Sequence, residues 1–269
     1  MAFSMNANHG NGFPRGLVQP TQGFRFSIDA LLLSCFAANR SPSRVIDLGT
    51  GCGVISLGLI LRRPRESFAI LGVDTNPEMI AAAQINARKL TASQRFSPVL
   101  GDVTELAAIP EFQPGSFDLA LCNPPYRLIG HGRTPLNESK KTAMFEAKTR
   151  IEDFLSGASQ ALKTKGRLCL IHLPEHLPRL LDRLVASGLE PKRLRLIHAF
   201  TDKPASLLLL EARKGCNPGL SVEPPLILYL KGRSADGGII SRTTAQALEF
   251  CPFLDCNSSR PSPSRPGAL

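Results

Sequence analysis

Short apolar segments alternate with amphipathic ones along most of the chain. In the apolar segments Val, Ile, Leu and Phe follow one another without a polar residue at every second position, which is typical of strands buried on both faces of a sheet. We predict strands at 44–48, 68–74, 95–100, 117–122, 166–172, 192–200 and 206–212. The stretches between them have helical periodicity, and we predict helices at 26–38, 54–62, 77–90, 150–164 and 175–187, with a short turn at 103–108.

This regular succession of strand and helix predicts an α/β fold: a doubly wound, mostly parallel sheet of seven strands with helices on both faces. The last two predicted strands are joined by only five residues, 201–205. Five residues are too few for the crossover that parallel strands require. We therefore expect these two strands to form an antiparallel hairpin at one edge of the sheet.

The periodicity divides the chain into three parts. Residues 1–24 are rich in Gly, Asn, Pro and Gln and form an irregular leader, and residues 25–232 form the α/β domain. Residues 233–269 form a C-terminal extension that ends in NSSRPSPSRPGAL. That composition buries little apolar surface, so we expect the extension to be largely disordered.

Composition favours a cytoplasmic protein. No apolar run approaches the roughly 18 residues of a membrane span, and the N-terminus lacks a secretory signal. The seven cysteines are scattered without a CxxC pair, as expected for free thiols, and His172 and His176 are separated by Pro174, so we expect no metal. The net charge of +10 fits a polyanionic partner such as RNA, although equally basic proteins exist that bind none.

A glycine-rich turn follows the first predicted strand, in the passage VIDLGTGCGV at 45–54. Glycines at the end of a parallel strand let the backbone turn sharply and approach a ligand closely. The candidate binding residues of the turn are Asp47, Gly49, Thr50, Gly51 and Gly53. The motif lacks the GxGxxG spacing of dinucleotide sites and carries an acid within it, so S-adenosylmethionine is the favoured cofactor, its amino-acid part over the turn.

Two further acids end the next two strands. Asp74 closes the second strand, where a carboxylate accepts hydrogen bonds from both hydroxyls of a ribose. Asp102 follows the third strand, at a position suited to contact the adenine.

The passage Asn123-Pro124-Pro125-Tyr126 ends the fourth predicted strand. An exocyclic amine on an aromatic base is a poor nucleophile, because its lone pair is drawn into the ring. The Asn123 side-chain oxygen and the Pro124 carbonyl can accept the hydrogens of that amine and free the lone pair. The prolines stiffen the turn, and Tyr126 offers a ring on which a planar target stacks. We therefore predict that these four residues are catalytic and that Asn123 also borders the cofactor.

The order of these motifs resembles that of the class I, Rossmann-like methyltransferases that modify amino nitrogens. Residues 23–33 (GFRFSIDALLL) and 219–229 (GLSVEPPLILY) further resemble the bacterial tRNA adenine-N6 methyltransferases that act beside the anticodon of a valine tRNA. The likeness covers roughly residues 14–232. It implies a tRNA partner and an upstream segment packed over the cofactor, which Arg25 or Asp29 contacts. The basic residues of 127–150 then face the RNA phosphates.

Three alternatives to tRNA methylation stay open. Glutamine-N5 methyltransferases that modify peptide release factors also carry NPPY, although they usually have a helical domain before the glycine motif. Ribosomal RNA and DNA are further amino-group substrates. A catalytically silent RNA-binding module with the same fold is a different class, and cofactor binding separates it from the enzymes. The sequence does not specify the oligomeric state, although a monomer is slightly favoured.

Overall fold

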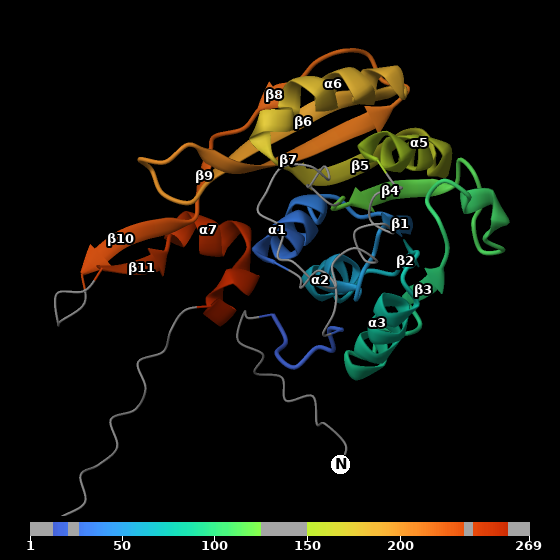
Figure 1. The fold of residues 1–269 in the computed structure, drawn as a ribbon, viewed down its shortest axis with the longest axis horizontal. Coiled ribbons are helices and arrows are strands. Elements are labelled where there is room, and N and C mark those ends of the chain that lie inside the picture. The colour runs from blue at the N-terminus through green and yellow to red at the C-terminus, as the bar shows by residue number, and fades with distance from the viewer. Residues whose placement is uncertain (1–12, 21–26, 125–149, 234–238, 258–269) are drawn as a thin grey trace, which may run out of the picture.

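The computed structural model describes residues 13–20, 27–124, 150–233 and 239–257. Its central feature is a nine-stranded sheet in the order β3-β2-β1-β4-β5-β7-β6-β8, with β9 also paired to β6 (Figure 1). The first five strands are β1 Arg44–Leu48, β2 Ala69–Asp74, β3 Phe96–Leu100, β4 Phe117–Cys122 and β5 Leu162–His172. They are followed by β6 Leu189–His198, β7 Ala205–Lys214, β8 Ser221–Val222 and β9 Leu226–Ile227.

The seven predicted strands and their hairpin are confirmed. Strands β1 to β5 pair in parallel, and β7 pairs antiparallel with both β5 and β6. The hairpin is not outermost, because the short strands β8 and β9 pair in parallel with β6. The overall topology is the mostly parallel, doubly wound sheet that the strand–helix alternation predicts.

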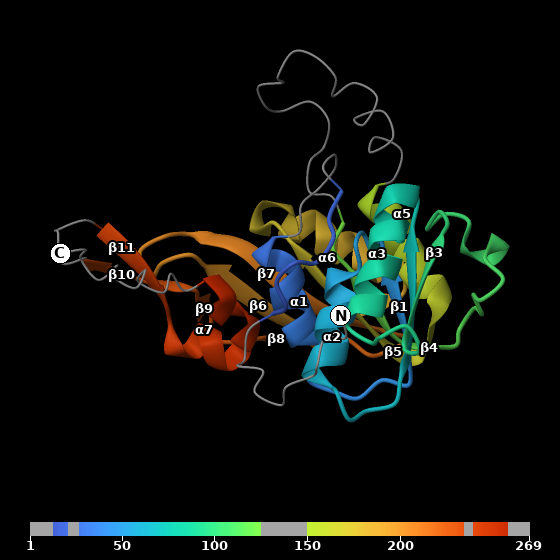
Figure 2. The ribbon, with the colours of Figure 1, turned by 90° about the horizontal axis from the view of Figure 1, so that it is seen from below.

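Helices cover both faces of the sheet (Figures 1 and 2). The apolar side chains of α1 Ile28–Ala37, α2 Val54–Arg62 and α3 Pro77–Lys89 pack in one core, and those of α5 Ile151–Ala161 and α6 Leu177–Ala186 pack in the other. Each helix returns the chain to the amino ends of the parallel strands. The loops at the carboxyl ends therefore gather on one edge, where ligands bind in folds of this kind.

The C-terminal extension is ordered where the structure describes it. Strands β10 Tyr229–Arg233 and β11 Ile239–Thr243 form a separate antiparallel pair, followed by α7 Ala245–Phe250 and a 3₁₀ turn at Pro252–Asn257. Phe253 packs edge to face on Phe13 with ring centroids 5.2 Å apart. Residues 239–257 thus differ from the expected disorder, because a few apolar side chains, among them Cys251 and Leu254, are buried in the core. The boundaries of the three sequence parts remain a prediction.

Among the described residues, the structure contains no helix long and apolar enough to cross a membrane.

Candidate functional site

Three polar residues lie at the carboxyl ends of neighbouring strands. Asp47 of β1 is in register with Gly72 of β2 and Leu121 of β4. Asp74 follows Gly72 by two positions, so the alternation of strand side chains places it on the face of Asp47, one step further along the sheet. Asn123 is the first residue after β4, two positions beyond Leu121. Two strand spacings separate the Asp74 and Asn123 backbones, about 10 Å.

Asp47 is fully buried beneath the glycine turn. Its Oδ2 accepts hydrogen bonds from the Thr50 hydroxyl at 2.8 Å and the Ser56 hydroxyl at 2.6 Å, whereas its Oδ1 has no partner among the described residues. Burial raises the pKa of Asp47 to about 6, and the two hydroxyl donors only partly offset this. The carboxylate therefore fixes the turn with one oxygen and offers the other to a cationic or hydrogen-bond-donating ligand.

The glycine turn is tied to the adjoining strand by its backbone. The amides of Gly49 and Thr50 both donate to the Val73 carbonyl, at 2.8 and 2.9 Å. Gly51 has φ +54°, and a side chain there would extend into open space. Gly53, by contrast, has φ +84°, and its added Cβ would lie 2.6 Å from the Phe96 ring. Gly51 is thus exposed toward a ligand, whereas Gly53 serves the packing of α2.

Asp74 is anchored by two backbone amides. Its Oδ2 accepts from the Gly51 amide at 2.8 Å and its Oδ1 from the Asn76 amide at 2.9 Å. Burial raises the pKa of Asp74, and these two donors oppose that rise. A carboxylate accepts about four hydrogen bonds, so both oxygens retain lone pairs for the hydroxyls of a ribose.

Asp102 lies beside this row, in the loop after β3. Its Oδ1 accepts from the Thr104 amide at 2.9 Å and from the Thr104 hydroxyl at 2.8 Å. The preceding Gly101 donates its amide to the Asp74 carbonyl at 3.0 Å. The loop that carries Asp102 is therefore attached to the end of β2, and its contact with adenine stays a prediction.

The NPPY passage is described only in part. Asn123 is half-buried and Pro124 is buried, directly after β4. Pro125, Tyr126 and the basic stretch up to residue 149 lie outside the described residues, as does Arg25. Asp29 lies half-buried in the first turn of α1, where its amide donates to Ser27. The helix runs toward the amino end of β1, so Asp29 lies at the carboxyl edge, and its role stays a prediction.

Two site residues were not identified from the sequence. Ser56 holds Asp47, and Asn86 of α3 is a fully buried amide that joins the glycine turn to the N-terminal segment 13–20. The Asn86 Oδ1 accepts from the Val18 amide at 2.7 Å, and its Nδ2 donates to the carbonyls of Val18 at 2.9 Å and Cys52 at 3.0 Å. The sequence contains one signal for both residues: Ser56 and Asn86 are each a polar residue on the apolar face of a predicted helix.

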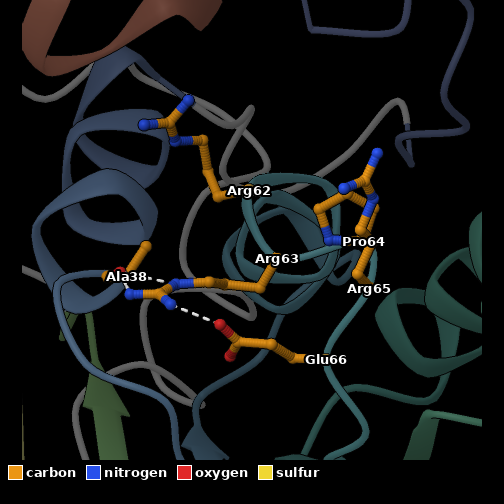
Figure 3. A pocket seen from close by; sticks show the side chains of 6 residues that line it. All are labelled: Ala38, Arg62, Arg63, Pro64, Arg65 and Glu66. Carbon is orange, nitrogen blue, oxygen red and sulfur yellow. Dashed lines mark hydrogen bonds and ion pairs between the residues drawn. The ribbon is translucent and has the colours of Figure 1, made fainter.

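The cavity shown in Figure 3 lies at the other edge of the sheet. It has a volume of about 340 Å³ and is formed by the end of α1 and the end of α2. Arg63 contacts the Ala38 carbonyl and Glu66, while Arg62 and Arg65 make no contact drawn in that view. Because α2 begins at the glycine turn and ends here, this cavity is remote from Asp47.

The carboxyl edge fits a cofactor of the S-adenosylmethionine type. The unpartnered Asp47 Oδ1 is suited to a positively charged amine, Gly51 leaves open space above the turn, and Asp74 is suited to a ribose. Within the described ranges, no three His, Cys, Asp or Glu side chains gather as a metal site requires. His172 and His176 instead pack edge to face, with ring centroids 5.2 Å apart.

Comparisons with known proteins agree with this geometry. The resemblance seen in the sequence is confirmed by relatives named tRNA1(Val) (adenine(37)-N6)-methyltransferase. The relative from Shewanella sp. (strain MR-4) is 26% identical over 228 residues, which cover 85% of this chain and 92% of the relative. The relative from Porphyromonas gingivalis (strain ATCC BAA-308 / W83) is 28% identical over 193 residues, 70% of this chain and 74% of the relative.

The fold is also found among solved structures. The crystal structure of a predicted O-methyltransferase from Agrobacterium tumefaciens superposes with a TM-score of 0.60 at 24% identity, covering 74% of this chain and 87% of that one. At that identity the likeness concerns the fold alone. Residues 39–194, more than half of the chain, match the family model described as a methyltransferase domain, which spans the glycine turn, Asp74 and Asn123. The chain belongs to this methyltransferase-domain family.

Proposed function

We propose that this protein transfers a methyl group from S-adenosylmethionine to the N6 amine of an adenine in tRNA, with adenine 37 beside the anticodon of a valine tRNA as the first candidate. The observation that carries the proposal is the placement of Asp47, Asp74 and Asn123 at the carboxyl ends of three adjacent strands. The names of the relatives support the choice of substrate. Such a substrate places the enzyme in the cytoplasm.

The chain's own residues divide the work between binding and activation. Asp74 would hold the ribose of the cofactor, and the Asp47 Oδ1, which has no partner among the described residues, would interact with its amino group. When bound, the cofactor supplies an electrophilic methyl group on sulfur. Asn123 and the Pro124 carbonyl accept hydrogen bonds from the adenine amine and so make its lone pair available, which is catalysis mainly by positioning and electrostatics.

Proton removal needs no dedicated base. The methylated amine is acidic and loses its proton to water. The target adenine must first leave its stack, since a base buried in a duplex does not reach the end of β4; a loop nucleotide beside the anticodon is already accessible or is cheaply flipped. Tyr126 is proposed to stack on the exposed base.

Labelling separates this function from its rivals. The purified protein is incubated with radiolabelled S-adenosylmethionine and either tRNA from cells lacking the modification or unmethylated release factor. We expect label in the tRNA, recovered as N6-methyladenosine after nuclease digestion. Label in the release factor alone would overturn the proposed substrate but not the proposed catalytic residues. Binding of the cofactor without any transfer would favour a silent RNA-binding module.

A further inference from the structure

A second cavity, of about 420 Å³, lies at the amino edge of the sheet. It is formed by the residues that follow α1, the start of β6, the end of β7 and the segment after β7. The edge is opposite the one that carries Asp47 and Asn123. The charged side chains in its lining are Arg40, Lys192, Arg193, Arg213 and Glu211.

The one carboxylate in this lining is buried and shared by three guanidinium groups. Glu211 is 3% exposed. Its Oε2 lies 3.2 Å from the Arg193 Nη2 and 3.5 Å from the Arg167 Nη1, and its Oε1 lies 3.2 Å from the Arg213 Nε. Arg167 is itself 6% exposed, whereas Arg193 and Arg213 are partly exposed, so the cluster has a buried centre and opens toward the cavity. One negative charge does not neutralise three positive ones.

The acidic residues around the cluster do not neutralise its excess positive charge. Glu223 takes a second contact from Arg193 at 3.2 Å and one from Arg195 at 3.9 Å. Glu190 is opposite Arg213 in the register of β6 and β7. The region then holds three carboxylates against six cations, an excess of three positive charges: Glu190, Glu211 and Glu223 against Arg40, Arg167, Lys192, Arg193, Arg195 and Arg213.

Two of the cations in the lining have no carboxylate partner among the described residues. Arg40 is exposed and makes no ion pair there, and the Lys192 ammonium contacts only the Asn217 carbonyl. Neither side chain is buried, so both contribute positive charge to the lining of the cavity that no carboxylate offsets. The lining of the cavity is therefore suited to bind an anion.

We propose that this cavity binds a phosphate group, carried either by a free polyphosphate or by an RNA backbone. Phosphate oxygens accept charge-assisted hydrogen bonds from guanidinium and ammonium groups, and a multiply charged anion matches the excess of three positive charges. Arg40 and Lys192 are its direct contacts, and Arg193 and Arg213 supply the field behind them. The site is separate from the carboxyl edge and does not depend on the proposed methyl transfer.

Pyrophosphate is the first probe, measured by isothermal titration calorimetry on the full chain. We expect Arg40→Glu and Lys192→Glu each to weaken binding at least tenfold. Arg88→Glu is the matched control: it makes the same charge change on the exposed end of α3, remote from the cavity. The milder variants Arg40→Ala and Lys192→Ala replace the reversals if thermal unfolding shows that a reversal disturbs the fold.

A twelve-nucleotide RNA of uridine and cytidine tests the second source, because it lacks the adenine that the carboxyl edge would select. If the backbone of RNA is the natural ligand, Arg40→Glu weakens the binding of this RNA. The magnitude of the slope of log K against log salt then falls by about one per lost contact. If a free anion is the ligand, only pyrophosphate binding is lost. The proposal is overturned if wild type binds neither probe, or if Arg40→Glu and Arg88→Glu bind both equally well.

Discussion

The two edges of the central sheet carry opposite charge, and their carboxylates are held by different kinds of contact. At the carboxyl edge, Asp47 and Asp74 are held by hydroxyl and amide donors close to them in the chain, such as Thr50 and Asn76. At the amino edge, Glu211 is held by Arg167 of β5 and Arg193 of β6 as well as by Arg213 of its own strand, and Arg167 also contacts Asn39 across 128 positions. The partners of the two aspartates lie within 23 positions of them in the chain, whereas those of Glu211 lie up to 44 positions away.

The two sets of carboxylates are therefore expected to differ in role: one to bind a ligand, the other to stabilise the fold. At the carboxyl edge, the buried Asp47 Oδ1 has no partner among the described residues, and we propose that a ligand supplies one. The amino edge concentrates charge around a saturated carboxylate that joins β5, β6 and β7. Substitution of Asn123 is expected to change the rate, whereas substitution of Glu211 is expected to change the free energy of unfolding.

The largest effect is expected for Glu211→Ala. Removal of the carboxylate leaves the buried Arg167 and the partly buried Arg193 and Arg213 without their shared partner, which we expect to cost about 3–5 kcal/mol of unfolding free energy. Chemical denaturation measures this cost. Asp182→Ala is the control, because that carboxylate is exposed and its ion pair with Arg183 at 3.9 Å contributes little. A cost for Glu211→Ala as small as that of Asp182→Ala would show that the cluster does not hold the strands.

Asn123→Ala is expected to act on the rate and not on the fold. Loss of a preorganised acceptor for the adenine amine should lower the rate of methyl transfer by about 10²–10³. The measurement is single-turnover methylation of tRNA with unchanged thermal unfolding. Gln84→Ala removes an exposed amide on α3 and should leave the rate unchanged. A loss below tenfold in the folded Asn123 variant would remove this residue from the chemistry.

The same contrast explains how much the sequence disclosed. The seven strands and the row of Asp47, Asp74 and Asn123 were predicted, because apolar runs and short motifs are local properties of the chain. Asn86 was not predicted as a site residue: its partner Val18 is 68 positions away, and nothing in the sequence marks that pairing. The packing of Phe253 on Phe13 escaped for the same reason, since a few apolar residues in a polar extension do not reveal what they contact.

The pH dependence of Asp47 sharpens the comparison further. Its pKa is about 6 in the folded protein and 3.8 for the ordinary carboxyl, so the folded state binds more protons than the unfolded state between those values. The contribution of this group to unfolding free energy therefore falls by about 3 kcal/mol as pH rises from about 4 to about 6. Asp47→Asn lacks this titration.

The free energy of unfolding is measured for wild type and Asp47→Asn without the cofactor. As pH rises from about 4 to about 6, the value for wild type should fall relative to that of the variant. Cofactor affinity should move in the other direction, because the ionised carboxylate attracts the cationic amine; binding should weaken below pH 6 in wild type and stay flat in the variant. A stability difference that moves in favour of wild type as pH rises, or a cofactor affinity that falls as pH rises, would contradict the burial-driven shift.

The smallest effect is expected at Asn86, where the site meets the N-terminal segment. In Asn86→Ala the hydrogen bonds to Val18 and Cys52 are lost without burying a charge. The loss of these neutral hydrogen bonds, about 1–2 kcal/mol, should weaken cofactor binding about five- to thirtyfold by loosening the glycine turn beside Gly51. The rate at saturating cofactor should change little, since Asn86 lies outside the row of Asn123. Gln84→Ala makes the same truncation of an amide on the exposed side of α3 and should leave affinity unchanged. Equal affinities in the two variants would mean that the turn holds its shape without the N-terminal segment, and the carboxyl edge would then be local in every part.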